Sequence, residues 1–234
     1  MAFGASEVAL ALLPVLERAH QRHAHGADRK VDGNSPAVRC FIAIDLTSDV
    51  RAAIARAQTR VRTAAAHADV RWVDPTQFHL TLKFLGAVPD ERVPAVSAAL
   101  EGAVADTAPI ALAAAGLGGF PSLRSARVLW AGITAGVPEL ARLAAAIDRA
   151  LTPLGFPPEG RSFRGHLTIG RVRSPRAGRA LAAAVEAAGA SGASGASAFG
   201  SWTASEVVLY ESRLKPTGAV YTAVSRHPLR GARA

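Results

Sequence analysis

The chain has 234 residues and 50% hydrophobic content, which is enough for a sizeable core in one domain or in two small lobes. Its 27 Lys and Arg residues outnumber 18 Asp and Glu residues. The net charge of +9 favours polyanionic partners such as nucleic acid, although Arg is also a common solubilising residue. A single cysteine, Cys40, excludes an intramolecular disulfide and a cysteine-based zinc cluster, and no apolar run reaches the ~18 residues of a membrane span, so we expect a cytoplasmic protein.

The first 37 residues differ in composition from the rest of the chain, and we expect residues 1–37 to form a flexible appendage. An Ala/Leu-rich segment from Ser6 to His25 is compatible with a helix, and a turn-rich stretch follows from Gly26 to Pro36. The histidines of this segment have no carboxylate cluster beside them. An exposed helix end therefore explains them better than a metal site does.

Residues 38–234 alternate β-like runs with Ala-rich amphipathic segments, a pattern typical of an α+β or α/β domain. Strands are expected at Arg39–Asp45, His79–Leu85, Ile110–Gly116, Val128–Ile133, His166–Val172 and Val207–Ser212. Helices are expected at Ser48–His67, Pro89–Ala105, Pro138–Leu154 and Arg176–Ala188. The Gly-Ala-Ser repeat from Gly189 to Ser197 is expected to be a flexible surface connection. Cys40, in an apolar run, is expected to be a buried strand residue rather than a nucleophile.

A short motif occurs twice in the chain. Phe78-His79-Leu80-Thr81-Leu82 is echoed 87 positions later by Gly165-His166-Leu167-Thr168-Ile169. One His-x-Thr alone is ordinary on a solvated sheet face. Two matching copies, each followed by basic residues, indicate an internal duplication that carries function.

Strand periodicity translates the motif into geometry, because side chains two positions apart share a face of a sheet. In the first copy this places His79, Thr81 and Lys83 on one face, and Leu80, Leu82 and Phe84 on the other. The second copy repeats the pattern of polar His and Thr against apolar neighbours. The pair predicts two strands that line a wet cleft, in which Lys83 either contacts phosphate or is simply solvated.

These motifs resemble those of the two-histidine (2H) phosphoesterases, specifically the RNA 2′,3′-cyclic phosphodiesterase family, also called 2′-5′ RNA ligases. The resemblance covers residues 38 to 229 and extends beyond the two motifs. Further matching stretches are Arg39–Asp45, Arg71–Val73, Phe78–Gly86, Gly116–Pro121, Arg127–Gly132, Val207–Ser212 and Tyr221-Thr222. One local departure is Gly165, where family members usually have Pro.

The resemblance implies an α+β fold with two pseudo-symmetric lobes, each an antiparallel sheet backed by helices, and an active site in the groove between them. Opening a strained cyclic phosphate requires a base that activates water and an acid that protonates the leaving ribose oxygen. Two imidazoles with ordinary pKa values near 6.5 can supply both functions near neutral pH. The resemblance assigns the acid role to His79 and the base role to His166, with a 2′-phosphate as product.

Further substrate contacts are expected from hydroxyl, guanidinium and aromatic side chains. The Thr81 and Thr168 hydroxyls can donate to non-bridging phosphate oxygens, and by resemblance Arg171 completes a His-x-Thr-x-x-Arg arrangement that holds a phosphoryl oxygen. Phe41 either stacks on the terminal base or is a core aromatic.

The resemblance leaves more than one function open. With a 5′-hydroxyl RNA end in place of water, the reverse reaction forms a 2′-5′ linkage. A 2H enzyme that acts on a small cyclic nucleotide and a non-catalytic RNA-binding module are the alternatives. For the favoured enzyme we expect no cofactor and no metal, RNA 3′ ends with a 2′,3′-cyclic phosphate as partner, no membrane association, and a monomer.

Overall fold

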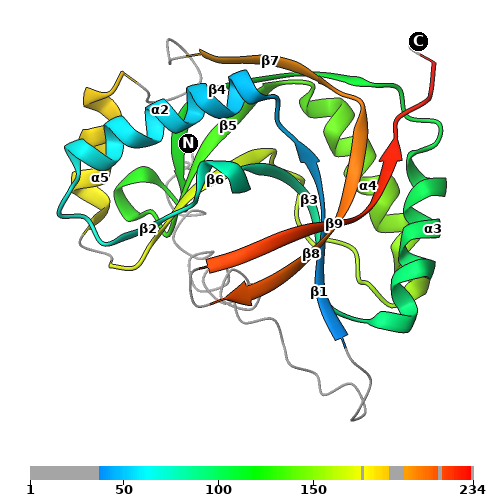
Figure 1. The fold of residues 1–234 in the computed structure, drawn as a ribbon. Coiled ribbons are helices and arrows are strands. Elements are labelled where there is room, and N and C mark those ends of the chain that lie inside the picture. Colours follow the sequence, from blue (N-terminus) through cyan, green and yellow to red (C-terminus); the bar gives the residue numbers. More distant parts are fainter. Residues whose placement is uncertain (1–36, 175–176, 190–197, 216–217, 233–234) are drawn as a thin grey trace, which may run out of the picture.

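The computed structural model describes residues 37–174, 177–189, 198–215 and 218–232, and in this part of the chain nine strands form one curled antiparallel sheet (Figure 1). The strand order is β7-β4-β5-β6-β3-β1-β8-β9, and β2 pairs with β6 beside this path. The strands are β1 (Ala37–Asp45), β2 (Val70–Trp72), β3 (His79–Pro89), β4 (Ile110–Phe120), β5 (Val128–Ala135), β6 (His166–Val172), β7 (Ala198–Ala204), β8 (Glu206–Lys215) and β9 (Gly218–Pro228).

Helices cover the sheet in two pairs. They are α2 (Ser48–Ala64), α3 (Val93–Val104), α4 (Val137–Leu151) and α5 (Ala177–Ala187), with short 3₁₀ turns at Pro75–Gln77, Asp90–Arg92, Leu123–Ser125 and Thr152–Leu154. Helices α3 and α4 pack together and contact β9 and β3, while α2 packs on α5 and β7 (Figure 1). The helices of each pair come from different halves of the sequence, so the two halves are interlocked.

The sheet consists of two four-stranded lobes that meet at the centre. One lobe is β3-β1-β8-β9 and the other is β6-β5-β4-β7, and β2 extends the edge of β6. The two lobes join through β3 and β6, where Leu80 is the partner of Leu167. The predicted fold of two pseudo-symmetric lobes, each an antiparallel sheet backed by helices, is therefore confirmed.

Amphipathic helix faces build the core between the helices and the sheet. In α4 the apolar residues Leu140, Leu143, Ile147 and Leu151 recur at three- and four-residue spacing, and all four are buried. Burial of one such side chain contributes roughly 1.5–3 kcal/mol. This packing fixes the apolar face of the central strands and leaves their other face for polar side chains.

Most predicted elements are present, with differences at their ends. Helix α3 begins at Val93 rather than Pro89, because Asp90–Arg92 forms a 3₁₀ turn before it. Strands β2 and β7 were not predicted, and β9 was implied only by the family-matching pair Tyr221-Thr222. The appendage at residues 1–36 and most of the Gly-Ala-Ser repeat lie outside the described residues.

Two expectations about residue environment can be compared with the structure. Cys40 is 3% exposed in β1, and burial raises the pKa of its thiol to about 11, so the prediction of a buried strand residue is confirmed. Among the described helices, none is long and apolar enough to cross a membrane.

Candidate active site

The two motifs lie on the adjacent central strands, at the junction of the two lobes. Leu80 and Leu167 are register partners and are both 0% exposed, so the apolar faces of the two motifs pack into the core. Residues on either side of this pair point to the opposite face, where facing Cβ atoms of antiparallel strands lie about 4.5–5.5 Å apart. The structure thereby brings together the four predicted residues His79, Thr81, His166 and Thr168.

The two imidazoles are held by the same kind of hydrogen bond. His79 Nδ1 lies 2.7 Å from the carbonyl oxygen of Gln77, and His166 Nδ1 lies 2.7 Å from that of Arg164. A carbonyl oxygen only accepts, so each Nδ1 carries the hydrogen and donates it. Nε2 is therefore the nitrogen of each ring that is left for chemistry.

The electrostatic surroundings of His79 are mixed. Burial is the largest influence and lowers its pKa below the ordinary histidine value. The hydrogen bond to Gln77 and the carboxylate of Asp45 raise the pKa, whereas Arg51 and His166 lower it. A negative charge thus offsets part of the cost of protonating this ring.

The surroundings of His166 are uniformly positive. Burial lowers the pKa of His166, and only the hydrogen bond to the Arg164 carbonyl opposes that change. The guanidinium groups of Arg171 and Arg164 lower the pKa further. The ring also meets Phe120 edge-on at 5.0 Å, and Arg164 lies over the same Phe120 ring at 5.3 Å. These surroundings favour a neutral imidazole, which can act as a base.

The prediction that Lys83 shares the histidine face is wrong. Thr81 pairs with Ala43 but Lys83 pairs with Ile42, so one extra residue, Leu82, interrupts the alternation as a β-bulge. Lys83 consequently turns to the helix side, where it is 3% exposed.

On the helix side, the Lys83 ammonium is paired within the core. It lies 2.5 Å from the Asp148 carboxylate of α4 and donates to the carbonyl of Pro157 at 2.8 Å. Lys83 therefore supports the fold rather than contacting phosphate.

The same bulge moves Phe84 to the cleft face, contrary to the predicted apolar face. Phe84 is the register partner of Phe41, is 51% exposed, and its ring centroid lies 6.1 Å from that of Phe41. Strict alternation of side chains cannot reveal this change of face, because it depends on a local register shift.

Arg171 reaches the cleft through an equivalent irregularity in β6. Thr168 pairs with Trp130 and Gly170 with Leu129, so Ile169 is the extra residue at the position that Leu82 occupies in β3. Arg171 is exposed and close enough to His166 to lower its pKa, so the structure brings this predicted residue into the site.

Phe41 lies beneath the site rather than in its opening. It is 3% exposed, and its ring centroid lies 4.7 Å from His79, 5.2 Å from Tyr210 and 4.9 Å from Tyr221. Of the two roles considered for Phe41, this burial supports the core aromatic. The ring packs against the His79 imidazole and limits its movement.

Two residues that lie in the family-matching stretches, but to which the sequence assigned no role, complete the cleft. Arg71 of β2 is the register partner of Arg171, so the two side chains leave the sheet on the same face. Tyr221 of β9 meets His79 edge-on at 5.3 Å. Burial raises the pKa of the Tyr221 phenol, and the positive charges of Arg171 and Arg71 only partly oppose that change. Both residues reach the site through long-range strand pairing, which a local sequence pattern does not show.

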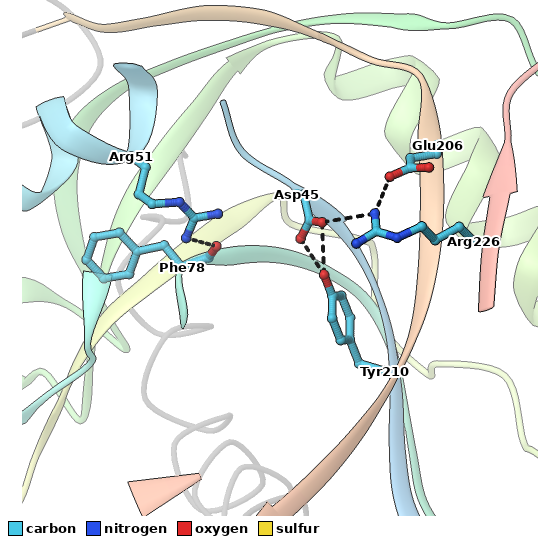
Figure 2. Close-up of polar contacts among 6 residues, drawn as sticks. All are labelled: Asp45, Arg51, Phe78, Glu206, Tyr210 and Arg226. Carbon is cyan, nitrogen blue, oxygen red and sulfur yellow. Dashed lines mark hydrogen bonds and ion pairs between the residues drawn. The ribbon is translucent and has the colours of Figure 1, made fainter. Parts of the chain in front are cut away.

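The turn before His79 is fixed by Arg51 from α2. The Arg51 guanidinium donates to the carbonyl oxygens of Pro75, Thr76 and Phe78 at 2.8, 3.1 and 2.9 Å, the last of which is drawn in Figure 2. These bonds hold the 3₁₀ turn whose last residue, Gln77, accepts the hydrogen bond from His79.

Gly165, which departs from the family pattern, precedes the second motif without a steric demand for glycine. A Cβ atom there would lie 3.3 Å from Ile133, a contact that a small shift can relieve. Within the described residues, no group of three His, Cys, Asp or Glu side chains is placed to hold a metal ion.

Comparison with known proteins agrees with this geometry. The model of the family described as LigT like Phosphoesterase matches residues 44–130 and again residues 133–221, one match for each motif. The chain belongs to the LigT-like phosphoesterase family. The repeated match shows that the duplication seen in the motifs extends over both halves of this phosphoesterase.

Individual relatives and structures give the same result. The RNA 2′,3′-cyclic phosphodiesterase of Methanothermobacter thermautotrophicus is 34% identical to this chain, and the match covers 79% of this chain and 95% of the relative. The RNA 2′,3′-cyclic phosphodiesterase of Thermus thermophilus is 33% identical, and the match covers 83% of this chain and 91% of the relative. The crystal structure of TT0787 from Thermus thermophilus superposes with a TM-score of 0.67 at 31% identity, covering 83% of this chain and 100% of that one. Escherichia coli LigT complexed with 3′-AMP gives a TM-score of 0.63 at 26% identity, covering 83% and 99%.

Proposed function

We propose that this phosphoesterase hydrolyses RNA 2′,3′-cyclic phosphate ends to 2′-phosphates, with His79 as general acid and His166 as general base. The observation that carries the proposal is the pair of imidazoles at the lobe junction, each with Nδ1 bonded to a carbonyl and Nε2 left for chemistry. Such a pair supplies the two proton transfers that cyclic ester opening requires.

The reaction follows from this arrangement in one balanced step. His166 Nε2 takes a proton from water as the water oxygen attacks phosphorus. The bond between phosphorus and ribose O3′ breaks, and His79 Nε2 protonates the departing oxygen. Phosphate remains on O2′, and the histidines exchange protonation states until solvent resets them.

Negative charge on the non-bridging oxygens is met by donors on the same face. The hydroxyls of Thr81 and Thr168 accompany the histidines, and the guanidinium groups of Arg171 and Arg71 supply positive charge beside them. With a 5′-hydroxyl RNA end in place of water, the reverse reaction would form a 2′-5′ linkage at the same groups.

The base-stacking role considered for Phe41 suits Phe84 better. Phe84 lies on the cleft face with half of its surface exposed, whereas Phe41 is covered. Proteins that bind single-stranded RNA commonly stack its bases on exposed aromatic rings beside a basic groove. Phe84 is thus the proposed platform for a base of the RNA 3′ end.

The relatives support this substrate over a small cyclic nucleotide, because those described above are named RNA 2′,3′-cyclic phosphodiesterases. The net charge of +9 favours a polyanion as well. A monomeric state, a cytoplasmic location and independence from metals stay predictions from the sequence.

The decisive experiment is incubation with an RNA oligonucleotide that ends in a 2′,3′-cyclic phosphate, in the presence of EDTA, followed by identification of the phosphate position. A 2′-phosphate product is expected. Turnover only after zinc or magnesium is restored would contradict the acid-base mechanism, and binding without turnover would favour a binding module. Uridine 2′,3′-cyclic phosphate as a parallel substrate separates RNA from small-nucleotide activity.

A further inference from the structure

The two histidines have equivalent places in the fold, so their motif alone does not determine which of them is protonated. Both are first residues of central strands, both donate Nδ1–H to the carbonyl two residues earlier, and burial lowers the pKa of both. If they divide the acid and base roles as proposed above, something outside the motif has to distinguish them.

Asp45 is such a group. It is the last residue of β1 and the register partner of His79, the first residue of β3. Register partners in an antiparallel sheet project from the same face, so the carboxylate lies beside His79 on the cleft side. The charged side chains that act on His166 in the described part of the chain are Arg171 and Arg164, which are both cations.

The Asp45 carboxylate is held in place by its neighbours. The Tyr210 hydroxyl of β8 lies 2.7 Å from one carboxylate oxygen and 2.9 Å from the other, and Arg226 of β9 lies 3.6 Å from the second. Figure 2 shows Tyr210 and Arg226 converging on Asp45, and the Arg226 nitrogen that faces Asp45 is also bonded to Glu206. A carboxylate fixed in this way keeps its negative charge at a constant position.

The same tyrosine connects the carboxylate to the packing of the imidazole. The Tyr210 ring stacks on Phe41 at 5.2 Å and 18°, and Phe41 packs against His79 at 4.7 Å. The network thereby defines both the position of the charge and the position of the ring that it affects.

We propose that Asp45, held by Tyr210, is the positioning residue that stabilises protonated His79 and so assigns the acid role to the first motif. Asp45 acts through His79 and does not touch the substrate. This inference rests on the proposed acid-base function of the two histidines.

The Gln77 carbonyl also favours protonated His79, but the Arg164 carbonyl does the same for His166. The other titratable side chains around His79 oppose the effect of Asp45 or are neutral. Arg51 from α2 and His166 from β6 disfavour the protonated ring, and Tyr221 from β9 is a neutral phenol that meets it edge-on. Asp45 is therefore the carboxylate that offsets these cations. Removal of its charge lowers the pKa of His79 further, and the acid then loses its proton at lower pH.

The test compares the pH dependence of kcat/KM for the unaltered protein, Asp45→Asn and Glu206→Gln, with the cyclic phosphate oligonucleotide as substrate. A bell-shaped profile is expected for all three. In Asp45→Asn the alkaline limb moves to lower pH. We therefore expect kcat/KM to fall about tenfold near pH 8 and by a smaller factor near pH 6. Glu206→Gln removes the same charge from the same network, farther from His79, and its alkaline limb stays in place.

Asp45→Glu distinguishes the charge from the packing. This variant retains a carboxylate and should keep its alkaline limb near that of the unaltered protein. If the alkaline limb of Asp45→Glu instead lay at as low a pH as that of Asp45→Asn, the effect would come from lost packing, and the proposal would be overturned. The same conclusion would follow if Glu206→Gln moved the limb as far as Asp45→Asn does, or if Asp45→Asn did not move it.

Histidine ring titration by NMR, without substrate, provides a readout that does not depend on turnover. In Asp45→Asn the His79 signal should titrate at lower pH than in the unaltered protein, with a smaller change at His166. Equal changes at both rings would overturn the proposal. If the unaltered protein does not cleave the oligonucleotide, the proposed function fails, while the ring titration still tests the effect of Asp45.

Discussion

The motif strands β3 and β6 have the same local structure, and their similarity includes backbone features as well as the motif residues. Both begin with the histidine, both alternate polar and buried residues over three positions, and both contain a bulge at the third residue after the histidine. These shared features place the imidazole and the hydroxyl identically in each lobe. What the copies have in common is therefore the geometry that we propose for phosphate binding and proton transfer.

The copies differ immediately after the bulge. The fourth residue after the histidine is Lys83 in β3, which pairs with Asp148 in the core, and Gly170 in β6. The fifth is Phe84 in β3 and Arg171 in β6, and both lie on the cleft face. Duplication thus provided the symmetric pair of histidines, and divergence next to it gave one lobe an aromatic surface and the other a cationic one.

The largest expected effect tests the shared part. His79→Ala and His166→Ala should each reduce kcat by on the order of 10²- to 10⁴-fold, because each ring transfers a proton in the transition state. Binding of a 2′-phosphate product should change far less. Full activity of His166→Ala beside an inactive His79→Ala, in steady-state assays of folded protein, would show that the second motif is only a structural echo of the first.

The next effect tests the difference at Lys83. Lys83→Ala should lower the free energy of unfolding by about 3–5 kcal/mol, because it leaves the Asp148 carboxylate, whose side chain is 18% exposed, without its partner. Urea unfolding measures the change. Arg142→Ala, which breaks the exposed pair with Glu139, is the control and should cost less than about 1 kcal/mol. If Lys83→Ala lost activity but kept its stability, Lys83 would contact phosphate rather than support the fold.

A smaller effect tests the aromatic surface. Phe84→Ala should raise KM for the oligonucleotide by roughly 5- to 150-fold, which corresponds to the ~1–3 kcal/mol of a base-aromatic stack. Phe84→Trp should retain affinity because it preserves a ring face. Leu214→Ala, at another exposed apolar residue, is the matched control and should leave KM unchanged. Equal effects of the Phe84 and Leu214 substitutions would argue against stacking.

The smallest expected effect tests the symmetry of the hydroxyls. Thr81→Ala and Thr168→Ala should each weaken product binding and kcat/KM together by about tenfold, the worth of one hydrogen bond to a charged group. Similar losses in the two variants would support equivalent phosphate contacts from the two lobes. A loss confined to one of them, in parallel assays of binding and rate, would restrict the symmetric site to the histidines.

Much of this molecule was predictable because the decisive signals are local. The four His and Thr residues share a face through simple strand alternation, and the main helices follow from amphipathic spacing. Lys83 and Phe84 were misplaced because a bulge depends on the pairing of two strands, which alternation within one strand does not encode.

The remaining features depend on contacts between distant segments. Asp45 and Tyr210 are 165 positions apart, and Arg71 reaches Arg171 through the pairing of β2 with β6. No local pattern connects such residues. Strand β2 is also only three residues long, too short to give a periodic signal.

The division of roles between the two lobes can be tested most directly with a leaving group that needs no acid. An RNA 2′,3′-cyclic phosphate with sulfur in place of O3′ expels a thiolate, which is far less basic than an alkoxide. With this substrate His79→Ala should recover most of its lost rate, while His166→Ala should remain as impaired as with the oxygen substrate. Recovery by His166→Ala alone, or equal recovery by both variants, would contradict the assignment of acid to the first motif and base to the second.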